Sequence, residues 1–179
     1  MKEKTNFINA KSLALVGIMA ATVECGKFAL SFLPNVEVVT ILLALYGYVF
    51  GWYGVIAAGV FVCIEPLIWG TGSWVITYII YWPCVAIVFM MLAKAKVKNR
   101  WIITLVAMLM TVSFGLLSSV IDSAFYLGIN EHFVKNTVIY YARGIVFYIV
   151  QTVCNAVLFS VLFNYFVSKL RLIKGRFLP

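Results

Sequence analysis

Long apolar segments separated by short polar connectors recur along the whole chain. A helix needs about 20 apolar residues to cross the hydrocarbon of a bilayer, so segments of this length predict membrane-crossing helices. Six segments are expected, at about residues 12–30, 36–50, 55–69, 74–93, 101–127 and 137–166. The pattern therefore predicts an all-α integral membrane protein of about six transmembrane helices, forming one domain over residues 1–179.

Basic residues gather in three places: before the first segment, between the fourth and fifth, and after the sixth. They are Lys2, Lys4 and Lys11, then Lys94, Lys96, Lys98 and Arg100, and finally Lys169, Arg171, Lys174 and Arg176. With six crossings, all three groups lie on one side, which the positive-inside rule assigns to the cytoplasm. Both termini are expected there, and the acidic residues of the other connectors are expected on the outer face.

Composition agrees with a membrane protein and changes little else. Hydrophobic residues make up 64% of the chain and charged residues 11%, more apolar surface than a soluble domain of this size can keep from water. The net charge of +8 raises the question of nucleic acid, but the basic residues flank apolar segments and form no separate face, so no nucleic-acid partner is expected. The four cysteines are scattered singly and predict neither a zinc site nor disulfides.

The first segment follows three lysines, as a signal peptide would follow basic residues, but its length favours an uncleaved helix. Small residues recur on it at helical spacing, namely Ala10, Ala14, Gly17 and Ala21. Such residues let a second helix approach closely in lipid. That second helix could belong to a partner or to this chain itself. Glu24 and Lys27 lie one turn apart near the end of the segment and are expected to pair with each other.

The connector Phe32-Leu33-Pro34-Asn35-Val36-Glu37 places two polar side chains where the chain re-enters the apolar region. Pro34 removes a backbone donor and disfavours helix at the residue before it. Polar groups at membrane depth are costly and by default line a site. Asn35 and Glu37 could instead cap the second helix.

Aromatic residues form a stripe on the fourth segment before Pro83. Trp74, Tyr78, Tyr81 and Trp82 share one helical face. Two interpretations remain open, a belt at the membrane interface and the wall of a binding pocket.

Two further charges within predicted helices need an explanation. Asp122 lies near the end of the fifth segment and Arg143 about two turns into the sixth. Arg143 must extend to the interface, pair with an acid such as Asp122, Glu37 or Glu24, or contact a ligand.

Catalytic motifs are not visible. The chain has no Gly-x-x-x-x-Gly-Lys phosphate loop and therefore is not expected to hydrolyse ATP itself. His132 is the only histidine and stands beside Glu131 in a connector, a pattern typical of a solvated pair. We expect no enzyme activity, no metal and no cofactor.

Three features together resemble the substrate-binding S components of energy-coupling factor (ECF) transporters. They are the alanines four apart at the start of the first helix, the Phe-Leu-Pro-Asn-Val-Glu stretch, and Val49-Phe50-Gly51 closing the second helix. Ile18 departs from the alanine pattern, which the family continues with a small residue at that position.

The resemblance implies an importer component in a plasma membrane, of bacterial origin, that binds a vitamin or vitamin precursor at its outer face. It implies partners too: a transmembrane coupling protein and two ATPase subunits. Docking to them would use Ala10 and Ala14, with Gly17 and Ala21 taking over part of the face. The implied pocket residues are Asn35, Glu37, Trp74, Tyr78, Trp82, Asp122, Tyr126, Arg143 and Asn155.

Two other classes fit the helices. A structural scaffold similar to the rod-shape protein MreD would need no outer pocket lined by acid and Arg. A secondary transporter working alone would need an internal repeat or a polar path through the membrane.

Overall fold

The computed structural model describes residues 9–33 and 36–178, which form seven α-helices and no strand. Their bounds are α1 Ala10–Ala29, α2 Val39–Phe50, α3 Trp52–Trp69, α4 Ser73–Lys94, α5 Arg100–Leu127, α6 Phe133–Val161 and α7 Phe163–Phe177. The all-α prediction is confirmed.

Five helices, α1, α3, α4, α5 and α6, are long and apolar enough to cross a membrane. Large apolar side chains on α5 and α6, among them Leu105, Leu109, Val146 and Val153, are exposed on the molecular surface. Side chains of this kind are stable on a surface only where lipid or a partner covers them. The chain is therefore a multi-pass membrane protein.

The short helix α2 occupies the centre of the molecule. It has 12 residues, all but Leu42 buried, and at 1.5 Å per residue it is about 18 Å long. Gly47 brings its backbone against α4, because a Cβ at Gly47 would lie 2.1 Å from the carbonyl oxygen of Ala86. Neighbouring helices surround α2, so it faces protein on nearly every side.

The end of the chain differs from the prediction. The sixth predicted segment, 137–166, is divided at Leu162 into α6 and a separate helix α7 that extends through the basic tail. No Pro or Gly marks the division, and backbone hydrogen bonds from Leu162 to Leu158 and from Phe166 to Leu162 bridge it. Lys174 of α7 donates to the carbonyl of Val49 at 2.8 Å, which holds α7 over the end of α2.

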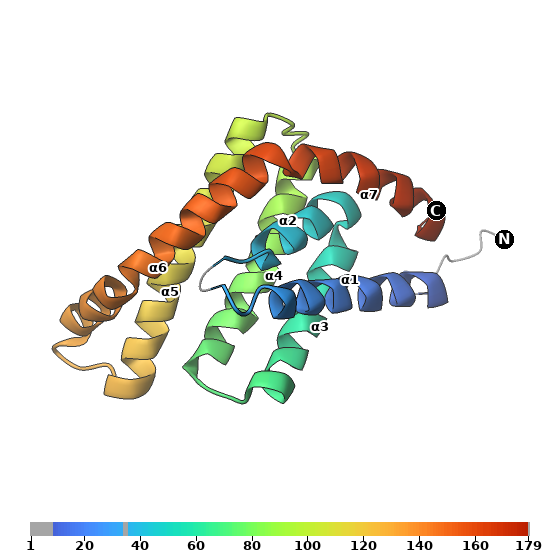
Figure 1. Ribbon diagram of the computed structural model, residues 1–179. Helices are drawn as coiled ribbons and strands as arrows, with labels where there is room; N and C mark the ends of the chain where they lie inside the picture. The colour runs from blue at the N-terminus through green and yellow to red at the C-terminus, as the bar shows by residue number, and fades with distance from the viewer. Residues whose placement is uncertain (1–8, 34–35, 179) are drawn as a thin grey trace.

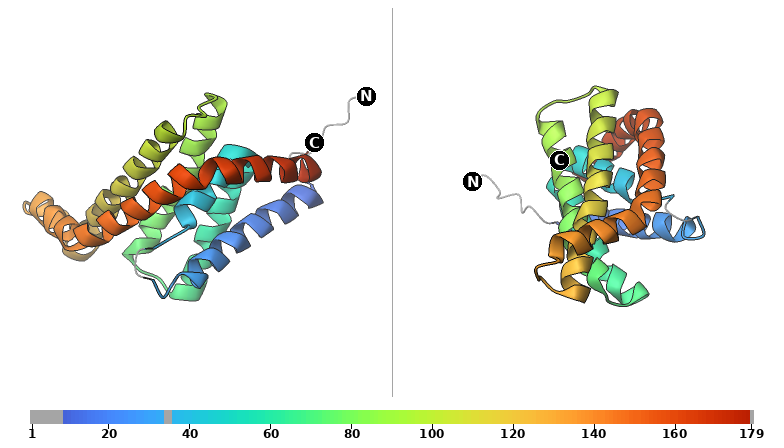
Figure 2. Two further views of the ribbon diagram at one scale, coloured as in Figure 1. Left: turned by 45° about the horizontal axis from the view of Figure 1, so that its top comes forward. Right: turned by 90° about the vertical axis from the view of Figure 1, so that its left-hand side faces the viewer.

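The helices form two groups, the α5–α6 hairpin and the group of α1, α2, α3 and α4. The two groups diverge toward one end of the molecule (Figure 1). The left view of Figure 2 shows the α5–α6 hairpin leaning away from α1 and α3. The chain end after α7 lies near the start of α1, where residues from both line one shallow hollow.

Between the two ends of the molecule the core is filled with aromatic rings. Phe89, Phe159 and Phe163 lie with ring centroids 5.3 to 5.6 Å apart and are almost completely buried. Tyr48 packs edge-on against Phe163 and donates to the carbonyl of Val97 at 2.7 Å. This packing joins α2, α4, α6 and α7 beneath the divergence of the two helix groups.

Candidate functional site

A cavity of about 480 Å³ lies at the end of the molecule where α1 ends, α2 begins, α3 ends and α4 begins. Its volume falls in the range of small-molecule sites. α5 and α6 each contribute to one wall. The lining residues are Lys27, Leu30, Ser31, Leu33, Val36, Glu37, Val39, Glu65, Trp69, Trp74, Tyr78, Trp82, Phe114, Tyr148 and Gln151.

The aromatic stripe of α4 forms one wall of this cavity. Trp74, Tyr78 and Trp82 follow each other at four-residue spacing and meet edge to face, with centroids 5.1 and 5.4 Å apart. Tyr81 is buried behind Trp82 against Phe114 and does not line the cavity. Trp82 is 3% exposed, and its Nε1 donor has no hydrogen-bond partner. The geometry of the stripe matches the pocket interpretation, and Trp74 and Tyr78 form a continuous apolar surface for a ring.

Lys27 forms an ion pair with Glu65 of α3 across the cavity. The expected pairing of Lys27 with Glu24 is wrong: both Glu24 oxygens lack a hydrogen-bond donor, and the Glu24 carboxyl lies beside that of Glu65. Helical spacing alone could not show that α3 brings a second acid to the same place. Glu65 is fully buried, and its Oε1 is also without a donor.

The ammonium of Lys27 also lies near two aromatic faces. Its Nζ is 5.2 Å from the ring centroid of Trp69 and 5.4 Å from that of Tyr78. The negative face of an aromatic ring attracts a cation at this distance. Lys27 is thus held by one carboxylate and two rings.

Glu37 joins the start of α2 to α6. Its carboxylate accepts hydrogen bonds from the backbone nitrogen of Thr40 at 2.8 Å and from Nδ2 of Asn155 at 2.8 Å. Asn155 is fully buried and also donates to Thr111 of α5 at 3.0 Å. Glu37 therefore both satisfies the first turn of α2 and lines the cavity, so its two interpretations are compatible. Asn155 lies behind the lining, and Asn35 falls outside the described residues.

Three predicted site residues lie elsewhere. Asp122 accepts a hydrogen bond from Ser73 at 2.6 Å, and the Tyr126 hydroxyl is 3.5 Å from the same Ser73 oxygen. This contact ties the end of α5 to the start of α4 beside the cavity, without lining it. Arg143 is exposed on α6, over the ring of Tyr140 at 5.9 Å, and is not brought to Asp122, Glu37 or Glu24.

Of the lining residues, only Glu37, Trp74, Tyr78 and Trp82 were expected in the pocket. The others had no assigned role there, among them Trp69, Phe114, Tyr148 and Gln151. Two glycines leave room for the Tyr148 ring, Gly144 on its own helix and Gly115 on α5, where a Cβ would lie 2.8 Å from the ring. That close approach holds Tyr148 of α6 against α5 at the cavity wall.

The small residues of α1 face outward. Ala10, Ala14, Gly17 and Ala21 are all exposed, and a Cβ added at Gly17 would meet no atom within 4 Å. They do not pack against the helices described here. The face remains free for another molecule.

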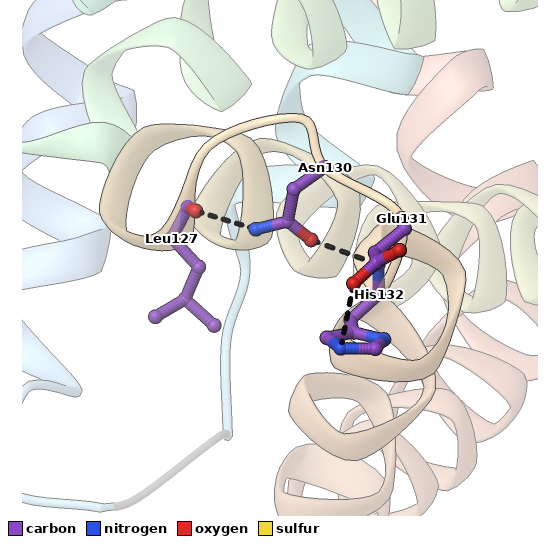
Figure 3. A network of polar contacts seen from close by, with 4 residues as sticks. All are labelled: Leu127, Asn130, Glu131 and His132. Carbon is purple, nitrogen blue, oxygen red and sulfur yellow. Dashed lines mark hydrogen bonds and ion pairs between the residues drawn. The ribbon is translucent and has the colours of Figure 1, made fainter.

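The connector between α5 and α6 is a solvated polar network (Figure 3). Asn130 donates to the carbonyl of Leu127 at 3.1 Å and accepts from the backbone nitrogen of His132 at 2.9 Å. The His132 and Glu131 side chains are 3.4 Å apart, and both are largely exposed. Across residues 9–33 and 36–178, no group of three His, Cys, Asp or Glu side chains could hold a metal ion.

Comparison with protein-family models, with curated proteins and with solved structures gave no match. The candidate function therefore depends on the cavity and on the faces of the helices.

Proposed function

We propose that this chain is the substrate-binding S component of an ECF-type importer, which captures a vitamin or vitamin precursor without changing it chemically. The observation that carries the proposal is the cavity of about 480 Å³, with its aromatic wall and buried polar atoms that lack partners. Pockets that bind small molecules combine such apolar walls with a few convergent polar groups.

The cavity faces the outside of the cell in this proposal. It lies at the end of the helices opposite Lys94, Lys96 and Arg100, and the basic helix α7 also belongs to that opposite end. The positive-inside rule puts the basic end in the cytoplasm. The chain then crosses a bacterial plasma membrane six times, with α2 as the short crossing that its neighbours shield from lipid.

The partners in this proposal are a transmembrane coupling protein and two ATPase subunits, and the outward face of α1 is their docking surface. Ala10, Ala14, Gly17 and Ala21 expose little more than backbone there. Without a hydrophobic driving force in lipid, helices associate by close backbone packing, which small residues permit.

The packed core supports a binding component over a transporter that works alone. A solitary transporter needs a polar path from the cavity to the other face. Trp82 closes the base of the cavity against Phe61, with ring centroids 6.2 Å apart, and the phenylalanine cluster fills the space farther in. Substrate release would then require a movement that the energised partner drives.

The direct test is mass spectrometry of ligand extracted from protein purified without added vitamin. We expect wild-type protein and the Trp101→Ala control to retain a small aromatic molecule, because Trp101 is exposed at the basic end. Trp74→Ala should lose it, because Trp74 lines the cavity. A ligand-free wild-type protein that purifies instead with wall-synthesis or cytoskeletal proteins would replace this proposal with a scaffold role.

A further inference from the structure

Carboxyl groups outnumber cations around the cavity. Of the described residues that line it, Glu37 and Glu65 are acidic and only Lys27 is basic, while Glu24 lies beside Glu65. Glu37 receives its hydrogen bonds from neutral groups, the backbone and side chain of Thr40 and the amide of Asn155. The surroundings of the cavity therefore hold three carboxyl groups and one ammonium group.

Hydrogen-bond acceptors also exceed donors at this place. Lys27 donates to Oε2 of Glu65, whereas Oε1 of Glu65 and both oxygens of Glu24 have no donor from any other residue, and the two carboxyl groups lie within hydrogen-bonding reach of each other. Buried polar groups in folded proteins are nearly always satisfied, so the exceptions point to something that binds there. Glu65 is fully buried and is one of the residues that line the cavity, so its unsatisfied oxygen belongs to the cavity wall.

The aromatic wall also favours a positively charged ligand. The faces of Trp and Tyr rings carry negative potential, and two of these rings already hold the Lys27 ammonium. Trp82 adds one unsatisfied donor, Nε1, on the same wall. The cavity thus offers carboxyl acceptors and aromatic ring faces.

We infer that the ligand of this cavity is a flat heteroaromatic cation. Its N–H group donates to Oε1 of Glu65, and its ring lies against Trp74 and Tyr78. This inference rests on the proposed function, and it narrows the substrate class, because a carboxylate or phosphate on the bound ring would meet uncompensated acids.

Three compounds that share one ring system allow the effect of ligand charge on binding to be compared. They are 4-aminoquinoline, a cation at pH 7, quinoline, which is neutral, and quinoline-4-carboxylate, an anion. Calorimetric titration of wild-type protein in detergent, stripped of endogenous ligand, should show the cation binding at least tenfold more tightly than the other two. A hydrogen bond to a charged group corresponds to a factor of about ten or more in affinity. Equal or tighter binding of the neutral or anionic compound would overturn the inference and leave the binding function intact.

Glu65→Gln tests the assigned acceptor. It should weaken 4-aminoquinoline binding by about tenfold or more while leaving quinoline binding unchanged. Glu131→Gln, an exposed acid on the α5–α6 connector, is the matched control and should behave as wild type. Because Glu65→Gln leaves Lys27 without its partner and could prevent folding, Glu24→Gln provides a second variant that keeps the Lys27–Glu65 pair. Unchanged preference for the cation in folded Glu65→Gln would contradict the assigned acceptor, and unchanged preference in Glu24→Gln would contradict the contribution of the excess carboxyl groups.

The ligand extracted from wild-type protein gives an answer that does not depend on these compounds. A molecule with a positive charge at pH 7 is expected. A neutral or anionic molecule would refute the charge inference alone. The absence of both an extracted ligand and any quinoline binding would refute the proposed function together with it.

Discussion

The Lys27–Glu65 ion pair is the contact that fixes the charge of the cavity. It joins α1 to α3 and places an ammonium group between a buried carboxylate and two aromatic faces. A charge buried at membrane depth is stable only with such a partner. The pair therefore both organises the cavity and holds the two helices together.

Removing one member of this pair should destabilise the protein more than removing both. Lys27→Met leaves Glu65 buried and unpaired, and we expect a loss of about 3 kcal/mol in unfolding free energy. The double variant Lys27→Met with Glu65→Gln should recover most of that loss. Thermal unfolding in detergent measures both. The control Glu131→Gln should change stability by about 0.5 kcal/mol or less, because its pair with His132 is exposed. Equal losses in the single and double variants would show that the pair does not act as a unit.

Arg143 provides a second test at this scale. Its guanidinium lies on the exposed side of α6 over Tyr140 and outside the cavity lining. Arg143→Met should therefore keep wild-type ligand affinity in calorimetric titration. A loss of about 1.5 kcal/mol or more, as for a hydrogen bond to a charged group, would mean that Arg143 reaches the ligand after all.

Sequence reasoning identified part of the site, and the residues it missed share a physical cause. The stripe Trp74, Tyr78 and Trp82 was visible because helical spacing alone puts its members on one face. The Lys27–Glu65 ion pair and the position of Arg143 could not be predicted in this way. They depend on how separate helices pack together and on the rotation of each helix about its axis. Nothing in the sequence indicated that Glu65 would be the partner of Lys27.

At the scale of the elements, apolar segment length predicted α3, α4 and α5 to within a few residues. The division between α6 and α7 was missed because Leu162 is not a residue type that favours turns. The chain changes there from an apolar helix to an amphipathic, basic helix. The central position of α2 was also not predictable, since its 12 apolar residues read as a short membrane span.

Gly47, the one glycine of α2, should not be replaceable by a larger residue without loss of stability. A Cβ there would overlap the backbone of Ala86, so Gly47→Ala must separate α2 from α4, and we expect a loss of about 1 to 3 kcal/mol. Gly59→Ala on α3 is the matched control, because its Cβ would meet no atom within 4 Å. Thermal unfolding of both variants gives the comparison. Equal stability of the two would contradict the close α2–α4 contact.

At the scale of the whole molecule, two functions are assigned to two different surfaces. In the proposed function, the cavity between the diverging helix groups would bind ligand and the outward face of α1 would meet the coupling partner. Because the cavity uses the end of α1 and the docking face uses residues nearer its start, substitutions can separate the two functions.

Replacing Ala10 and Ala14 together by Trp should abolish uptake in cells and leave ligand affinity unchanged. The bulky rings would keep the coupling protein away from α1, while the cavity lining stays intact. Calorimetric titration and uptake of labelled ligand measure the two functions separately. Leu105→Trp on the exposed surface of α5 is the control and should leave both unchanged. Loss of ligand binding in the Ala10 and Ala14 variant would show that this face is structural.

Uptake into liposomes tests most directly the central claim, that this chain is the substrate-binding component of an importer. The chain should be reconstituted alone and together with a coupling protein and its two ATPases, with ATP inside and the extracted ligand outside. The account predicts no concentrative uptake by the chain alone, and ATP-dependent uptake when the module is present. Concentrative uptake by the chain alone would contradict its assignment as a substrate-binding component.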